Sequence, residues 1–225
     1  MNVLIFGATG MVGQGALREC LLAPDVGQVR TVGRAATGRQ HTKLRETVHA
    51  NLWDYTACEA DLTGFDACFF CLGVSALGMS EADYARMTFD LTLAAAGTLA
   101  RLNPGMTFIY VSGAGTDSTE HGRVMWARVK GRTENALIGL PFKAVYLFRP
   151  GIIQPLHGIR SKTKAYRVLY TLTNPVLPLL RRAFPGLITT TEQVGRAMLA
   201  VARQGAPKRI LENKDIEALG ASGCG

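Results

Sequence analysis

The sequence predicts an α/β fold with a doubly wound parallel sheet, and three observations lead to that prediction. A short apolar strand at residues 2–6 runs directly into a glycine-rich turn and then into a stretch with helical spacing. Apolar runs of strand length then alternate with helical patterns along most of the chain. Strands and helices that alternate in this way form a parallel sheet whose right-handed crossovers cover both faces. The 225 residues are enough for one such domain with a full core.

Seven strands are expected in chain order, at residues 2–6, 29–32, 47–49, 67–72, 107–111, 143–148 and 208–211. Most are continuous apolar runs, which is typical of strands buried on both faces. Helices are expected at residues 12–22, 81–102, 122–140 and 192–203, and the first carries Val12, Ala16, Leu17 and Leu21 at helical spacing. Residues 54–65 are expected to form a short helix and a turn.

The alternation is interrupted at residues 151–187, which are basic and punctuated by prolines. This insertion follows the sixth strand, at the carboxyl edge of the sheet, where ligands bind in folds of this class. We therefore expect a single domain over residues 1–220, in which residues 151–187 form a small lid-like C-terminal lobe that covers the substrate. Residues 221–225 are expected to be a disordered tail.

Composition and patterning exclude several classes of protein. The longest charge-free apolar stretch, residues 168–180, is too short for a transmembrane segment and contains Pro175 and Pro178. The first strand starts at residue 2, which leaves no room for a signal peptide, so a cytoplasmic location is expected. The five cysteines form no disulfide framework, and no His/Cys/Asp cluster suggests a metal site. Cys68 and Cys71 fall in a predicted strand that turns them to opposite faces, which disfavours a redox pair.

The formal net charge of +8 belongs to one segment of the chain. No Asp or Glu occurs between residues 135 and 191, and that segment holds all of the excess basic residues. Three interpretations stay open: a solvated basic face, an anionic substrate or partner, and an anionic membrane surface. Nucleic acid is not expected as a partner, because no recognisable binding module accompanies the charge.

The glycine turn after the first strand predicts a site for a diphosphate. Gly7, Gly10 and Gly13 follow the strand with the spacing GxxGxxG. Glycines permit a tight turn and a close approach of backbone N–H groups to phosphate, and the following helix adds partial positive charge at its N-terminus. The sequence therefore predicts a dinucleotide-binding βαβ unit.

The residue after the second strand indicates which dinucleotide is bound. An acidic residue there would accept hydrogen bonds from the ribose and select NAD, whereas a basic residue accommodates the 2′-phosphate of NADP. The chain reads Thr31-Val32-Gly33-Arg34 at this point, with no acid in the following residues 35–39. Arg34 can pair bidentately with phosphate, so NADP is the expected cofactor.

Further motifs lie at the ends of later strands: residues 70–73, 110–112, 148–151 and 211–214, together with Lys130. With the glycine loop, they resemble the atypical short-chain dehydrogenase/reductases, which are NAD(P)-binding Rossmann proteins. The nearest branch in these motifs is the one typified by the Tat-interacting oxidoreductase-like protein. The resemblance covers nearly the whole chain and implies an oxidoreductase.

The resemblance implies a cofactor site residue by residue. The phosphate loop corresponds to Gly7, Thr9, Gly10, Met11, Val12 and Gly13, and the NADP-type position corresponds to Arg34. The pair expected beside the adenine is Asn51 and Leu52, and the pair expected along the ribose is Leu72 and Gly73. The cofactor-binding residues expected at the nicotinamide end are Lys130, Pro150, Gly151 and Ile152.

The catalytic residues implied by the resemblance include one departure. Ser112 matches the serine that orients the substrate carbonyl, and Lys130 matches the lysine that binds the nicotinamide ribose. The family's proton-donating tyrosine stands four residues before that lysine, on the same helix face, and this chain has Trp126 there. An indole N–H does not titrate in water, and loss of a general acid lowers rates by about 10²–10⁴. We expect Trp126 to shape the pocket. The alternative interpretation of Lys130 is an exposed helix lysine paired with Glu134.

Three outcomes of this replacement stay open. Water, Ser112 or a neighbour such as His121 relays the proton, or the reaction needs no such acid, or the protein binds NADP without turnover. The leading hypothesis is an NADP(H)-dependent oxidoreductase acting on a small carbonyl or alcohol. The alternative is a non-catalytic NADP(H)-sensing regulatory protein. A homodimer is common among related enzymes, but nothing in the sequence requires one.

Overall fold

The computed structural model describes residues 1–159 and 186–221. The predicted lobe at residues 151–187 therefore lies outside the described residues except at its two ends, and so does most of the predicted tail.

Seven strands form one parallel sheet in the order β3-β2-β1-β4-β5-β6-β9. Strand order reverses between β1 and β4, which both pair with their neighbours in parallel register. In such sheets the loops diverge at this point and leave a crevice at the carboxyl ends of the strands. The bounds are β1 (Asn2–Phe6), β2 (Gln28–Gly33), β3 (Leu44–Val48), β4 (Ala67–Phe70), β5 (Thr107–Val111), β6 (Ala144–Arg149) and β9 (Ile210–Glu212).

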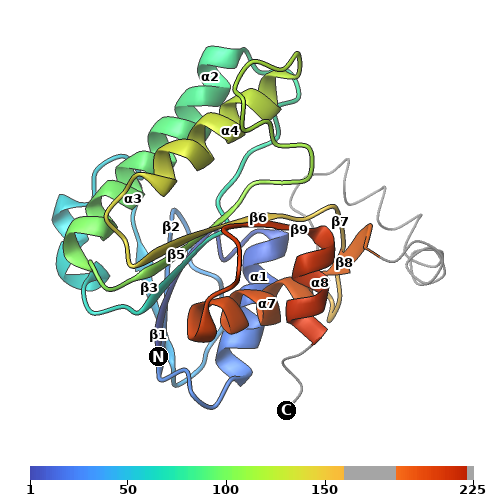
Figure 1. The fold of residues 1–225 in the computed structure, drawn as a ribbon. Helices are drawn as coiled ribbons and strands as arrows, with labels where there is room; N and C mark the ends of the chain where they lie inside the picture. Colours follow the sequence, from blue (N-terminus) through green and yellow to red (C-terminus); the bar gives the residue numbers. More distant parts are fainter. Residues whose placement is uncertain (160–185, 222–225) are drawn as a thin grey trace.

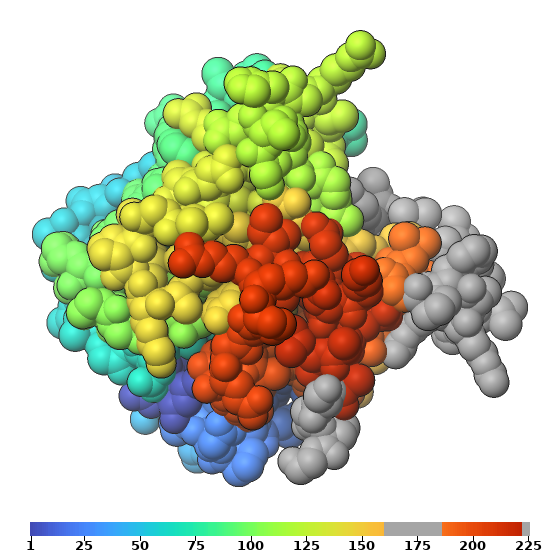
Figure 2. Space-filling view, in the orientation of Figure 1, coloured from blue at the N-terminus to red at the C-terminus, as the bar shows by residue number. Residues whose placement is uncertain are grey.

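Helices cover both faces of the sheet (Figure 1). One face carries α1 (Met11–Leu22), α7 (Thr191–Gln204) and α8 (Asn213–Ala221). The other carries α2 (Glu81–Ala85), η2 (Arg86–Asp90), α3 (Leu91–Leu102) and α4 (Met125–Ile138), with the short 3₁₀ helix η1 (Thr56–Leu62) packed on α3. In the space-filling view the C-terminal residues, in red, lie directly against the yellow α4–β6 region and the blue N-terminal region (Figure 2). The doubly wound α/β prediction is confirmed.

Two apolar cores lie on opposite sides of the sheet, and β1 contributes to both. Val3 and Ile5 belong to the core under α1 and α7, whereas Leu4 and Phe6 belong to the core under α3. The alternation follows from the two-residue period of a strand. Cys68 lies in the second core and Cys71 packs against the first, as expected for a pair on opposite faces.

The predicted strands and helices are all found within a few residues of their expected bounds. Helix α4 begins at Met125 rather than at residue 122, because Asp117 holds the preceding loop. Its carboxylate accepts hydrogen bonds from the backbone N–H of Thr119 at 3.0 Å and of Gly122 at 2.6 Å. The stretch 81–102 is helical throughout but contains the π-helical turn η2.

Three elements were not predicted. Strands β7 (Ile152–Gln154) and β8 (Ile188–Thr190) form a separate two-stranded parallel sheet, and α8 follows β9. Each of the two strands has three residues, which is too short for a period to be recognised in the sequence. They pair only because the fold brings residues 152–154 beside 188–190.

Candidate functional site

A cleft of about 500 Å³ opens at the carboxyl edge of the sheet, where strand order reverses. The glycine turn after β1 forms one wall, and the ends of β4, β5 and β6 form the other. A second cavity of about 400 Å³ lies alongside, between the glycine turn and the end of β2. Gly7, Thr9, Arg34 and Leu72 line both cavities, so the two form one continuous site.

At Gly7 and Gly13, neighbouring backbone atoms lie so close that no other residue would fit. Gly7 has φ +77°, and a Cβ there would lie 2.7 Å from the backbone of Cys71 and Leu72. A Cβ on Gly13 would lie 2.2 Å from the carbonyl oxygen of Gly7. Any side chain at either position would push the turn away from β4 or from α1. The glycines therefore hold the backbone tightly around the cleft.

The N-terminus of α1 faces this cleft and is suited to an anion. Gly10 is the N-cap residue, no side chain caps the helix, and its first turn holds no acidic residue. The turn itself is closed by a hydrogen bond from the Gly10 N–H to the Gly7 carbonyl at 2.8 Å. Unpaired N–H groups and the helix dipole together favour negative charge at such a terminus. Met11 and Val12, from the first turn, also line the cleft.

Arg34 lies at the far end of the site, exposed after β2, and it lines both cavities. The loop that follows is held by Glu46 of β3, which the sequence analysis missed. Its carboxylate accepts hydrogen bonds from the Thr37 N–H at 2.7 Å and from the Thr31 hydroxyl at 3.3 Å. Neighbouring strands in register bring Glu46 beside Thr31, and a single sequence gives no signal of such a pairing.

The two residues expected beside adenine are placed differently. Leu52 is buried and lines the cavity next to Arg34. Asn51 is exposed, and its side-chain oxygen accepts a hydrogen bond from the Trp53 N–H at 3.1 Å. Trp53 lines a smaller adjoining cavity with Arg34 and Leu72. Leu52 therefore lines the cavity, while the Asn51 side chain bonds within its own loop.

At the other end of the cleft, Ser112 and Lys130 are brought together. The Lys130 ammonium group donates a hydrogen bond to the carbonyl oxygen of Ser112. The Ser112 hydroxyl is buried and donates to Glu134 at 2.5 Å, with the Phe148 carbonyl 3.2 Å away. Because a hydroxyl carries a single proton, Ser112 has none left to donate to a substrate in this arrangement.

Glu134 and Arg149 form a buried ion pair behind Ser112, and the sequence analysis did not find it. Glu134 is fully buried, and Arg149 is 8% exposed. The guanidinium Nε lies 3.1 and 3.2 Å from the two carboxylate oxygens, and Nη2 donates to the same carboxylate and to Ser118. Glu134 thus pairs with Arg149 instead of lying on the surface with Lys130. One signal was present, since Glu134 stands one helical turn after Lys130, on the same face.

Burial lowers the pKa of Lys130 to about 8, and the nearby charge of Glu134 acts in the opposite direction. A buried ammonium group loses hydration, which favours its neutral form. Lys130 therefore releases its proton far more readily than a lysine in water does.

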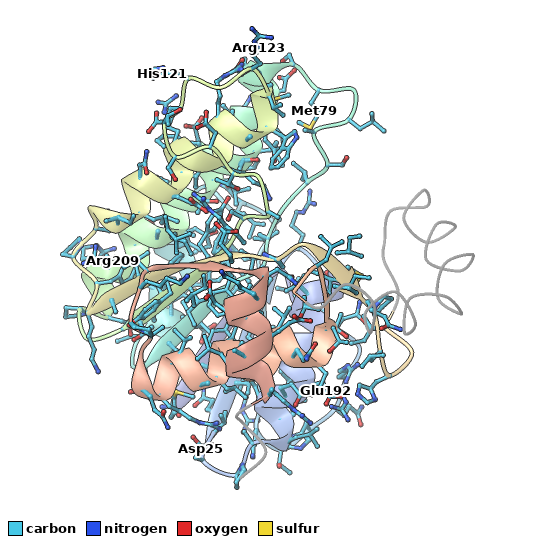
Figure 3. The ribbon with its side chains drawn as sticks, turned by 45° about the vertical axis from the view of Figure 1, so that its right-hand side comes forward. Asp25, Met79, His121, Arg123, Glu192 and Arg209 are labelled. Carbon is cyan, nitrogen blue, oxygen red and sulfur yellow. The ribbon has the colours of Figure 1, made fainter. Side chains whose placement is uncertain are left out.

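Trp126 lies on α4 one turn before Lys130 and is half-buried. Its ring packs near Gly115, where an added Cβ would come within 3.6 Å of it. The residues found lining the cleft in the described part of the chain do not include Trp126. His121 is exposed at the outer end of the loop before α4, away from the sheet, where Figure 3 labels it beside Arg123.

Pro150 and Gly151, which the resemblance assigns to the nicotinamide end, line the cleft after β6. In β7, Ile153 is the residue that lines the cleft, and its neighbour Ile152 is 44% exposed. Successive side chains of a strand point to opposite faces, which explains the difference. Leu72 and Gly73, at the end of β4, also line the cleft.

Asn213, the first residue of α8, holds the Gly151 turn. Its side chain accepts a hydrogen bond from the Gly151 N–H at 2.8 Å and donates one to the Gly186 carbonyl at 2.9 Å. It thereby links the two ends of the chain segment that contains the predicted lobe. Residues 211–214 form one of the motifs that carry the resemblance, and these hydrogen bonds give Asn213 a structural role within that motif.

The basic segment is only partly described. Arg149 is buried against Glu134, so it adds nothing to a surface patch, and Lys143 is exposed. The other six basic residues of this segment fall between residues 160 and 185, outside the described residues.

Residues 1–159 and 186–221 contain neither a metal-binding cluster nor a membrane-spanning helix. No group of three or more His, Cys, Asp or Glu side chains in these ranges is arranged to hold a metal ion. No helix in the same ranges has both the length and the apolarity needed to cross a membrane.

Comparison with known proteins gives distant relatives. No family model matches this chain. Protein fmp52-2, mitochondrial, from Aspergillus oryzae is 28% identical over 229 residues, which cover 96% of this chain and 95% of that protein. Protein FMP52, mitochondrial, from Saccharomyces cerevisiae is 29% identical over 167 residues, covering 73% and 69%. The relatives are named as mitochondrial proteins, and this finding overturns the expected cytoplasmic location.

Solved structures share the fold. The dTDP-glucose 4,6-dehydratase DesIV from Streptomyces venezuelae, with NAD and TYD bound, matches with a TM-score of 0.69 and 15% identity, covering 99% of this chain and 80% of that one. The Bordetella bronchiseptica enzyme WbmF in complex with NAD⁺ matches with a TM-score of 0.66 and 16% identity, covering 96% and 76%. A short-chain dehydrogenase/reductase superfamily protein from Agrobacterium tumefaciens with bound NAD gives 0.62 and 14%, covering 93% and 75%. This chain has the Rossmann-like α/β fold of these NAD-binding enzymes.

Proposed function

We propose that this protein is an NADP(H)-dependent oxidoreductase of the atypical short-chain dehydrogenase/reductase type, acting on a small carbonyl or alcohol. One observation carries the proposal. The glycine turn and the open N-terminus of α1 face a single cleft that has Arg34 at one end and Lys130 at the other. The motif at residues 211–214 supports placing it near the Tat-interacting oxidoreductase-like branch.

The residues present fit a dinucleotide phosphate. The turn has no room for side chains at Gly7 and Gly13 but leaves the cleft open, as a diphosphate cradle requires. Arg34 is exposed and free of an acidic partner among the ion pairs found in the described residues, so its guanidinium is available to a 2′-phosphate. When bound, the dinucleotide supplies or accepts a hydride.

In this proposal, each residue at the Lys130 end of the cleft has a specific role. Lys130 binds the ribose next to the nicotinamide, and the carbonyl of Ser112 holds its ammonium group in place. Pro150 and Gly151 form the backbone wall beside the nicotinamide. Ser112 orients the substrate carbonyl if its hydroxyl leaves Glu134. Trp126, on α4, shapes the pocket through the loop at Gly115, near which its ring packs. An anionic substrate remains part of the proposal on the basis of the basic segment.

Calorimetry with NADPH and with NADH tests the cofactor. NADPH is expected to bind more tightly, and Arg34→Ala should weaken NADPH binding about tenfold or more while barely changing NADH binding, because charged hydrogen bonds contribute about 1.5–3 kcal/mol. Arg39→Ala is the matched control, since Arg39 lies in the same loop but not among the cavity-lining residues. Equal losses for both dinucleotides would defeat the assignment of Arg34. No binding of either would end the proposal.

A second candidate is a non-catalytic NADP(H)-sensing regulatory protein, and two observations favour it. Trp126 cannot deliver a proton, and the Ser112 hydroxyl is bonded to Glu134 inside the protein. In that case cofactor occupancy would control binding to a partner.

The variant Trp126→Tyr separates the two candidates. Restoring a phenol one turn before Lys130 should raise NADPH oxidation on a panel of carbonyl compounds by at least about tenfold if the pocket is that of a reductase. Trp126→Phe serves as the control, because it changes ring size without adding a titratable group. A tyrosine variant that binds NADPH but stays silent on the whole panel would favour the sensor.

A further inference from the structure

The cleft offers few side chains that could release a proton. Among the described residues that line it, the titratable side chains are Arg34, Cys71 and Lys130. An arginine does not deprotonate in proteins. Burial raises the pKa of the Cys71 thiol to about 12, so it is a poor acid near neutral pH. Lys130 is left as the group whose proton can be released.

The Lys130 side chain is half-buried and lines the cleft. It carries three N–H donors, and within the described residues Ser112 is the one that accepts a hydrogen bond from it. Gly113, the next residue, has no side chain to cover it, and a Cβ there would lie 4.0 Å from the lysine Nζ. The Lys130 N–H groups that do not bond to Ser112 therefore remain available to a ligand that enters the cleft beside Gly113.

We propose that Lys130 is itself the proton donor for carbonyl reduction in this cleft, in place of the residue one turn earlier on α4. The inference rests on the proposed oxidoreductase function. It gives Lys130 a chemical role beyond binding the ribose, and it explains how the site could work with Trp126 at the preceding turn.

The reaction balances with groups already named. The carbonyl carbon accepts a hydride from the reduced nicotinamide dinucleotide, and the π pair of the C=O bond moves to oxygen. One N–H bond of Lys130 breaks as the O–H bond of the alcohol forms, which leaves a neutral amine. That amine takes up a proton from water before the next cycle.

The charges around Lys130 are compatible with this role. On its own helix, Glu134 faces it and opposes the loss of its proton. From β6, Arg149 is paired with Glu134 and offsets part of that charge. The end of β5 contributes the Ser112 carbonyl, while Cys71 and Arg34 line the same cleft. With burial dominant, the pKa of about 8 lies close to neutral pH, where a general acid is most effective.

The first test measures protonation of Lys130 without cofactor or substrate. Protein labelled with ¹³C at the lysine ε-carbons is titrated by NMR, and the Lys130 signal is assigned by its loss in Lys130→Met. A midpoint of about 8 is expected, against about 10.4 for the chain unfolded in urea. A midpoint near 10 in the folded protein would overturn the inference and would leave the proposed function untouched.

The second test measures turnover with NADPH and 4-nitrobenzaldehyde as the carbonyl probe. Lys130→Arg keeps a positive charge that does not titrate, so NADPH affinity by calorimetry should change less than about fivefold while kcat falls by about 10²-fold or more. In Lys130→Ala, added primary amines should restore turnover in proportion to their acidity, which a merely structural role would not produce.

Three results would contradict the inference while NADPH binding persists. They are full activity in Lys130→Arg, no reduction of the aldehyde by the wild type at any pH between about 6 and 10, and loss of activity in Tyr166→Phe or Tyr170→Phe. The last pair tests tyrosines of the sequence that fall outside the described residues. Absence of NADPH binding itself would instead count against the proposed function.

Discussion

Single residues decide whether the cleft can exist at all. Gly13 sits where α1 and the turn come closest, and the carbonyl of Gly7 occupies the space that a side chain would need. Glu134, Arg149 and Ser112, all buried, satisfy one another's polar groups. Buried charges are tolerated only when they are paired and hydrogen-bonded in this way. The base of the cleft is therefore held in place by the hydrogen bonds and the ion pair among Ser112, Glu134 and Arg149.

Gly13→Ala should destabilise the protein by about 3 kcal/mol or more, because the added methyl group would meet backbone atoms that cannot move aside cheaply. Urea denaturation measures the change, and calorimetry should show that NADPH binding is lost as well. Gly97→Ala is the matched control. Gly97 is an exposed glycine inside α3 with open space around it, so alanine there should stabilise by about 0.5–1 kcal/mol. A Gly13→Ala protein as stable as the wild type would refute this account of the turn.

At the scale of elements, helix α8, which was not predicted, has a structural role beside the cleft. It is the last element described, yet its first residue links the turn after β6 to Gly186, two residues before β8. Strand β7 starts at the residue after Gly151, and β8 starts two residues after Gly186. Residues far apart in sequence are thus joined beside the cleft.

Asn213→Ala should lower the free energy of unfolding by about 1–3 kcal/mol, since Asn213 is buried and the partly buried Gly151 N–H and Gly186 carbonyl would both lose their partner. Hydrogen exchange at the Gly151 amide should become faster. Asn135→Ala provides the comparison, because Asn135 also makes two side-chain hydrogen bonds but is exposed. Its removal should change stability by no more than about 0.5 kcal/mol. Unchanged exchange at Gly151 in the Asn213 variant would show that the contact does not hold the turn.

At the scale of the whole molecule, two apolar cores support a site that carries buried charge. The cores lie on opposite sides of the sheet, beneath the helices that Figure 1 shows on its two faces. Arg34 and Lys130 line the cleft at the carboxyl edge of the sheet. Burying the Lys130 ammonium group opposes folding whenever that group is charged. The stability of the molecule should therefore depend on pH through this residue.

The direction of that dependence follows from proton uptake. Below about pH 8 Lys130 is charged in both states, and its burial lowers the free energy of unfolding. Between about pH 8 and about pH 10.5 the unfolded chain holds a proton that the folded protein has released, so stability contributed by Lys130 rises with pH. Relative to Lys130→Met, the wild type should gain at most about 3 kcal/mol across this range. Urea denaturation of both proteins at several pH values measures the difference, and parallel curves would contradict it.

The sequence by itself determined the layered architecture, the order of its main strands and helices, and the glycine turn. These depend on local periodicity and on backbone conformations that glycine permits. Only the tertiary structure decided which side chains meet: Glu46 beside Thr31, Glu134 with Arg149 and Ser112, Asn213 with Gly151, and β7 with β8. Such pairs join positions distant along the chain, and local periodicity does not indicate which positions will meet. The same holds for the proton on Lys130, because its pKa is set mainly by burial, which exists only once the chain has folded.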